Sequence, residues 1–86
     1  MTAYKLTYRA FSLPENAVSI HLTLESAKYA QQRAVDLLKA MYGPPAYPYS
    51  VREEKVEDAL LMTTTVFITQ GDYSCYLRVM PIHIEE

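Results

Sequence analysis

The sequence predicts an α+β domain in which one long helix packs on one face of an antiparallel sheet of about four strands. Residues Leu24–Tyr42 repeat apolar side chains at the three- and four-residue spacing of an amphipathic helix. Two pairs of segments with the alternation of half-buried strands flank this helix: Ala3–Phe11 with Ala17–Leu22, and Ala59–Thr69 with Tyr73–Ile84. Because turn-forming residues join each pair, the expected order is β-β-α-β-β in a single domain of 86 residues, 1–86.

The first two segments are expected to form an antiparallel hairpin that leads directly into the helix. The segment Ser12–Asn16 contains Pro14 and Asn16 and is predicted to be the turn. One side of the first strand carries Tyr4, Leu6, Tyr8 and Ala10, and one side of the second carries Val18, Ile20 and Leu22.

The helix has a start signal and a stop signal. Thr23 can accept hydrogen bonds from the free N–H groups of the first turn, and Gly43 followed by two prolines ends the helix. At 1.5 Å per residue the helix spans roughly 28 Å, and it cannot bury an apolar stripe without a second layer. The stripe expected to face the sheet consists of Ala27, Ala30, Ala34, Leu37 and Met41, widened by Val35, Leu38 and Tyr42.

Two segments between the helix and the second hairpin have weaker patterns. Gly43–Ser50 contains three prolines, which fix φ and predict an extended connector. Its Tyr47 and Tyr49 either lie back on the core or form a recognition loop. Val51–Asp58 follows a serine with a glutamate three residues further on, which is a capping box, so a short helix or an irregular segment is expected.

The second hairpin specifies its own register. A two-residue loop at Gly71-Asp72 brings a uniformly apolar set of side chains to one face, which is the arrangement expected of a core. This set is Leu60, Met62, Val66, Ile68, Cys75, Leu77 and Val79. The same register places Met62 opposite Pro81, which has no N–H to donate, so the ladder is expected to end, bulge or run along an edge near Met80.

The other face of this hairpin is expected to stay open if the helix covers the first. Its cross-strand pairs are Phe67 with Tyr76, Thr65 with Arg78, Thr63 with Met80, and Leu61 with Ile82. An exposed apolar patch usually marks a partner surface. The alternative is a second small cluster that Val51–Asp58 or the proline-tyrosine loop covers. Since aromatic residues and arginine tend to anchor interfaces, the predicted partner-binding residues are Phe67, Tyr76, Arg78, Met80, Tyr47 and Tyr49.

Composition and motifs argue against several classes of function. A net charge of −2 removes the bulk electrostatic argument for nucleic acid or an anionic membrane, and no run of about 18 apolar residues predicts a membrane span. Cys75 is the single cysteine, so neither an internal disulfide nor a cysteine cluster for metal is expected. His21 and His83 lie far apart, and no phosphate loop or nucleophile motif is present. We therefore expect no cofactor, no metal site and no catalysis.

Two stretches carry a resemblance to a known group of proteins. Leu22–Leu38 (LTLESAKYAQQRAVDLL) and the ending YLRVMPIHIEE resemble pieces of small phage and mobile-element proteins, among them the anti-CRISPR inhibitors, over about a third of the chain. Members of that group often combine one alanine-rich helix with an antiparallel sheet. The resemblance implies a stoichiometric inhibitor that occupies a surface of a bacterial defence complex, and it assigns a role to no single residue. The single cysteine separately favours a reducing cytoplasm.

The favoured function is non-catalytic protein binding, and three alternatives stay open. The first alternative is single-stranded nucleic acid. The open face would suit it if the aromatic pair is joined there by the basic side chains of Lys5, Arg9, His21 and Arg78. A small dimeric enzyme with a pocket at its interface is the second alternative, and a homodimer that uses the open face is the third.

Overall fold

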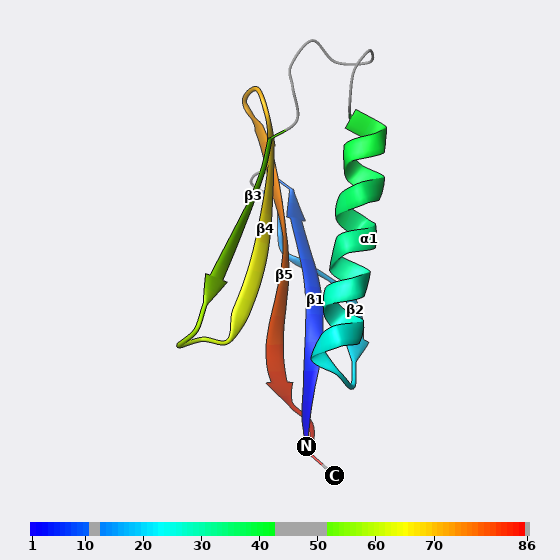
Figure 1. Ribbon diagram of the computed structural model, residues 1–86, viewed down its shortest axis with the longest axis vertical. Coiled ribbons are helices and arrows are strands. Elements are labelled where there is room, and N and C mark those ends of the chain that lie inside the picture. Colours follow the sequence, from blue (N-terminus) through cyan, green and yellow to red (C-terminus); the bar gives the residue numbers. More distant parts are fainter. Residues whose placement is uncertain (11–12, 43–51, 86) are drawn as a thin grey trace.

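The computed structural model describes residues 1–10, 13–42 and 52–85 and shows one helix against a five-stranded sheet (Figure 1). The strand order is β2-β1-β5-β4-β3, and every neighbouring pair is antiparallel. The α+β class is confirmed, whereas the sheet has five strands instead of four and the order is β-β-α-β-β-β. The elements are β1 (Thr2–Ala10), β2 (Asn16–His21), α1 (Leu24–Tyr42), β3 (Arg52–Asp58), β4 (Thr63–Gln70) and β5 (Tyr73–His83).

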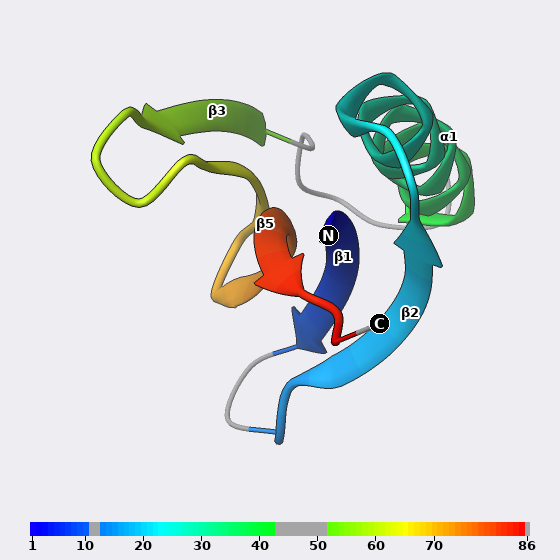
Figure 2. The same ribbon diagram turned by 90° about the horizontal axis from the view of Figure 1, so that it is seen from below.

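The core lies between α1 and one face of the sheet. Viewed end-on, the sheet is curved and α1 lies on its inner side, close to β1 and β2 (Figure 2). The fully buried cluster takes side chains from the helix and from β1, β4 and β5, so it joins both halves of the chain. Its members are Leu6, Ala27, Val35, Val66, Ile68, Leu77 and Val79. No helix in the described ranges is long and apolar enough to cross a membrane.

The helix begins as its sequence predicts and faces the sheet with most of the predicted stripe, but not with its C-terminal members Leu37 and Met41. The Ser26 N–H donates to Thr23 Oγ1 at 3.1 Å, which is the expected N-cap. Leu37 and Met41, predicted to be buried, are 63 % and 56 % exposed. Alanine and leucine at neighbouring spacings allow several rotations of the helix, and a polar residue selects among them. The side chains that face the sheet are Ala27, Ala30, Gln31, Ala34, Val35 and Leu38.

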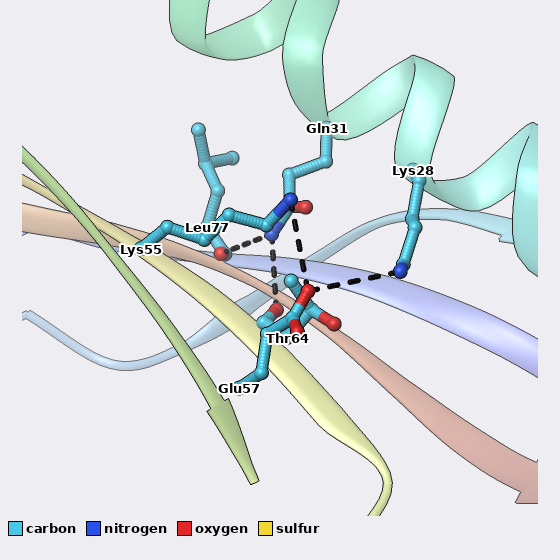
Figure 3. Close-up of polar contacts among 6 residues, drawn as sticks. All are labelled: Lys28, Gln31, Lys55, Glu57, Thr64 and Leu77. Atoms are coloured by element: carbon cyan, nitrogen blue, oxygen red, sulfur yellow. Dashed lines mark hydrogen bonds and ion pairs between the residues drawn. The ribbon is translucent and has the colours of Figure 1, made fainter.

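That polar residue is Gln31, which is only 3 % exposed. Its Nε2 donates to the Leu77 carbonyl oxygen at 2.7 Å and to the Thr64 carbonyl oxygen at 3.0 Å (Figure 3). A buried amide without partners is costly, so both N–H groups must find acceptors when the helix docks. Both hydrogen bonds form when α1 is rotated about its own axis so that Gln31 lies over β4 and β5.

The first hairpin forms as predicted, with an irregularity that the sequence does not signal. β1 pairs with β2 from Tyr4 opposite His21 to Tyr8 opposite Asn16. The register shifts between Leu6 and Thr7, so Val18 has no direct partner. This β-bulge bends the strand and shifts the following residues by one position.

The second hairpin has the predicted register. Ile68 lies opposite Cys75, Val66 opposite Leu77 and Thr64 opposite Val79. Gly71 has a φ of 61°, which suits the first loop residue of a type II′ turn.

The β4–β5 ladder ends before Met80, as the missing N–H of Pro81 predicts. From Met80 to His83, β5 pairs only with β1, with Met80 opposite Lys5. The expected pairs of Thr63 with Met80, Met62 with Pro81 and Leu61 with Ile82 are therefore not formed.

The segment Val51–Asp58 was expected to be a short helix or irregular, and this is wrong, because Arg52–Asp58 is the edge strand β3. Every side chain of β3 is exposed, and six of the seven residues are charged. A strand with water on both faces has no apolar alternation to reveal it. Charges on an edge strand also discourage pairing with a second sheet. Ser50, the first residue of the capping box, lies outside the described residues.

The strand predicted at Ala59–Thr69 was expected to begin at Ala59, and this start is also wrong. Residues 59–62 form a turn, and β4 begins at Thr63. Leu60 and Met62, predicted to be core residues, are 94 % and 62 % exposed. The core face of the hairpin accordingly starts at Thr64, and the apolar run before it projects away from the sheet.

The position of Gln31 predicts a pH-dependent loss of stability in Gln31→Glu. A buried carboxylate facing two carbonyl oxygens has a pKa raised above that of the unfolded chain. The free energy of unfolding should therefore fall as the pH rises, and at pH 7 it should be lower than that of the native protein by on the order of 3 kcal/mol. Urea unfolding between about pH 4 and pH 7 measures this.

Gln31→Met is the matched control, because it keeps the length of the side chain without an amide or a charge. It should cost about 1 kcal/mol at every pH in this range. Equal stability of the two variants at pH 7 would contradict the buried position of residue 31.

Candidate functional site

Alternation along the strands places a second set of side chains on the side of the sheet opposite α1. We call this the outer face. Residue pairs across β1, β5 and β4 define it, with Thr7 opposite Arg78 and Arg78 opposite Thr65. Its members are Lys5, Thr7, Arg9, Thr65, Phe67, Tyr76, Arg78 and Met80.

An aromatic pair lies at the centre of the outer face, as predicted from the register. Phe67 of β4 and Tyr76 of β5 are direct cross-strand neighbours, and both are half-buried. Their ring centroids are 6.0 Å apart, with an angle of 61° between the planes. This edge-to-face contact is a favourable geometry for aromatic rings and fixes both. Neither ring belongs to the core cluster under α1.

Arg78 is held in place by two contacts on the same face. Its guanidinium carbon lies 4.7 Å from the centroid of the Tyr76 ring. Its Nε donates to Thr65 Oγ1 at 3.2 Å. Thr65, on the face expected to stay open, is buried at 5 % exposure, so this part of the face is covered. The result is a compact row in which phenylalanine, tyrosine and arginine support one another.

A carboxylate completes this row, and the sequence analysis missed it. Glu15, in the segment between β1 and β2, accepts a hydrogen bond from the hydroxyl of Thr7, which is 2 % exposed. This bond is the main reason that the pKa of Glu15 is lowered from 4.5. Burial acts in the opposite direction and is the second largest effect, whereas the positive charges of Arg78 and Lys5 and a hydrogen bond from Tyr76 lower the pKa further.

One signal in the sequence could have suggested this role. Glu15 is the only acidic residue among residues 1–24, and Lys5 and Arg9 occupy alternate positions of the strand before it. A turn that folds back on that strand would bring opposite charges together. The bulge in the β1–β2 ladder decides the final position, and it could not be predicted from the residues alone.

The structure places the remaining predicted residues in different positions. Met80 is half-buried on the outer face beside Lys5, not beside Thr63. Arg9 shares the face, and its Nε donates to the Leu13 carbonyl oxygen at 2.9 Å. Tyr47 and Tyr49 lie outside the described residues.

His21, expected on the same face, is turned toward the helix instead. Its Nδ1 lies 2.8 Å from Ser26 Oγ and its Nε2 lies 2.7 Å from Ser19 Oγ. The Nδ1 contact joins the end of β2 to the first turn of α1, and the Nε2 contact with Ser19 holds the ring against β2. Three basic residues, Lys5, Arg9 and Arg78, remain on the outer face.

The groups that could support chemistry are dispersed. Within residues 1–10, 13–42 and 52–85, no three His, Cys, Asp or Glu side chains are grouped to hold a metal ion. Cys75 packs against the core, and burial raises the pKa of its thiol, with a partly opposing hydrogen bond to Tyr8. A surface hollow of about 420 Å³ is lined by Arg52, Glu53, Glu54 and Thr69, and Glu54 lies directly opposite Phe67 in the β3–β4 ladder. The outer face thus offers contact area and fixed polar groups.

No family model matches this chain, and no curated protein or solved structure matches it either. The candidate site therefore rests on the residues and geometry of the chain itself.

The lowered pKa of Glu15 predicts a pH-dependent contribution to stability. A carboxylate with a folded-state pKa below its unfolded value stabilises the fold above that unfolded value, and this contribution is lost as the pH falls through the folded pKa. Glu15→Gln should therefore be less stable than the native protein near pH 7, and the difference should shrink between about pH 5 and pH 3. Urea unfolding of both proteins across this range measures the difference.

Thr7→Val tests the main cause of the shift, because it keeps the shape of the buried side chain and removes the hydroxyl donor. The free energy of unfolding of this variant should depend less on pH than that of the native protein, although Glu15 is still present. A native protein and a Glu15→Gln variant whose stabilities fall in parallel with pH would refute the assigned role of this carboxylate.

Proposed function

We propose that the protein is a non-catalytic protein-binding module and that the outer face is its contact surface. The observation that carries the proposal is the row of Phe67, Tyr76 and Arg78 on the side of the sheet that the helix does not cover. Aromatic residues and arginine are the side chains that most often dominate the binding energy of protein interfaces.

Preorganisation supports the same proposal. The Phe67 ring supports Tyr76, Tyr76 lies under the Arg78 guanidinium, and Thr65 accepts a hydrogen bond from Arg78. Side chains that are already fixed lose less conformational freedom on binding. The row can therefore act as a rigid centre, with Met80 and Lys5 beside it.

The charges on the outer face favour a protein over nucleic acid. Lys5 and Arg78 are positive, but the Glu15 carboxylate lies near both of them and offsets their charge. A phosphate backbone that approached Arg78 and Lys5 would meet this negative group beside them. The alternative, in which single-stranded bases stack on Phe67 and Tyr76, is favoured by the rings themselves and predicts binding that weakens steeply with salt.

A finer proposal concerns the partner. The resemblance of the helix and the C-terminal stretch to anti-CRISPR inhibitors supports a bacterial defence complex of the CRISPR-Cas type as the target, met in the cytoplasm. A net charge of −2 is small for a nucleic-acid mimic, so the contact would depend on shape and aromatic residues.

Combining Phe67→Ala with Tyr76→Ala should abolish partner binding and leave the protein folded. Both rings are half-buried outside the core, so the stability should fall by about 1–3 kcal/mol without loss of the native fold. Pull-down from a bacterial lysate measures the binding, and circular dichroism with thermal unfolding measures the fold.

Tyr29→Ala is the matched control, since this tyrosine is 67 % exposed on α1 and contacts Arg33. It should retain the partner. Unchanged capture by the double variant would argue against the outer face, and an unfolded double variant would show that the rings belong to the core. Binding of a short oligo(dT) strand that disappears at high NaCl would favour the nucleic-acid alternative.

A further inference from the structure

The connection between β3 and β4 projects a short apolar segment into solvent. We call Ala59–Met62 the apolar tip. Leu60 is 94 % exposed, Leu61 66 % and Met62 62 %. Single exposed apolar residues are ordinary on protein surfaces, whereas three in succession at the end of a hairpin are a feature that water alone does not favour.

The apolar tip has a defined backbone conformation. Asp58 Oδ1 accepts hydrogen bonds from the Leu60 N–H at 3.0 Å and from the Leu61 N–H at 3.1 Å. Met62 has a φ of 54°, the left-handed conformation that glycine or asparagine adopts more easily. A turn that served only to connect two strands could use such a residue at lower cost. The leucines are thus presented in a fixed arrangement, which reduces the entropy lost on binding.

The strand that carries the apolar tip is connected to the helix. Glu57 Oε1 lies 3.9 Å from Lys28 Nζ of α1 and 3.7 Å from Lys55 Nζ (Figure 3). Lys39 Nζ of α1 lies 3.0 Å from Glu53 Oε2. These exposed ion pairs add little stability individually, but they span the length of β3 and orient it relative to α1.

The charges beside the apolar tip decide what kind of surface it suits. Asp58 directly precedes it, Glu57 is paired with Lys28 and Lys55, and no basic residue follows the tip before Arg78. An anionic membrane would repel the Asp58 carboxylate at the base of the tip, and so would a phosphate backbone. Two copies meeting tip to tip would bring their Asp58 side chains together. A basic border around an apolar socket is the complementary surface.

We propose that the apolar tip is a second contact site, which inserts Leu60 and Leu61 into an apolar socket bordered by lysine or arginine on a protein partner. The site lies outside the outer face, and the proposal holds whether or not that face binds the same partner.

The test places the photoreactive residue p-benzoylphenylalanine at position 60 of the full chain, and at position 37 as a control. Leu37 is also a leucine, and it is 63 % exposed on α1. After irradiation in a bacterial lysate, mass spectrometry identifies the peptide joined to each position. We expect position 60 to give one dominant adduct, at an apolar segment of a protein with flanking lysine or arginine, and position 37 to give none with that protein.

The partner so identified is then purified and titrated with Leu60→Ser, Leu61→Ser and Leu37→Ser. Each change at the tip should weaken binding by at least about tenfold, and the control by less than about twofold. All three variants should unfold at the native temperature, since none of these side chains is buried.

Several results would overturn the proposal. These are adducts scattered over polar surfaces of many proteins, an adduct with position 60 of a second copy, flotation of the protein with phosphatidylcholine vesicles that contain phosphatidylglycerol, or loss of folding in Leu60→Ser. The variants of the apolar tip leave Phe67 and Tyr76 unchanged. A negative result for the tip therefore does not decide whether the outer face binds a partner, which the Phe67→Ala and Tyr76→Ala double variant tests.

Discussion

The architecture depends on how α1 is rotated about its axis, and the amide of Gln31 fixes that rotation. The helix offers alanine and leucine in several directions, so apolar contact alone would tolerate more than one orientation. The two hydrogen bonds from Gln31 to the carbonyl oxygens of Thr64 and Leu77 can form in one of them. That orientation places Val35 in the core and leaves Leu37 in solvent. It also commits one face of the sheet to the helix, and no helix or second sheet of the described residues covers the other face.

The parts of the fold that were predictable are those in which local chemistry and burial agree. Gly71 permits a tight turn, and the turn sets a register that buries Val66 and Leu77 together. Pro81 lacks an N–H, so the end of the β4–β5 ladder could be placed as well. The Phe67–Tyr76 pair follows from the same register. In each case one residue type restricts the backbone, and the alternation of apolar side chains agrees with the strand register that results.

The parts that were not predictable are segments whose side chains face solvent instead of the core, because such segments need no apolar periodicity. β3 is charged on both faces, so neither period is visible in its sequence. Leu60 and Met62 continue the alternation of β4, but from Met80 onward β5 pairs with β1 alone, so neither side chain lies opposite a strand in the described part of the chain. Glu15 reaches Thr7 through a turn and a bulge, which no short pattern encodes.

These differences bear directly on function. A small domain has little interior, and this one fills it with one helix face and one sheet face. Exposed apolar side chains also occur on β2 and α1, but among the described residues the apolar tip before β4 is where three large ones follow one another in sequence. The outer face has compensating polar contacts from Thr65, Arg78 and Glu15, so it is stable in water. The apolar tip has none for its side chains, and its backbone is nevertheless fixed. A chain under selection for solubility alone would place polar residues at such a turn. The apolar tip is therefore a stronger indication of a binding partner than the outer face is.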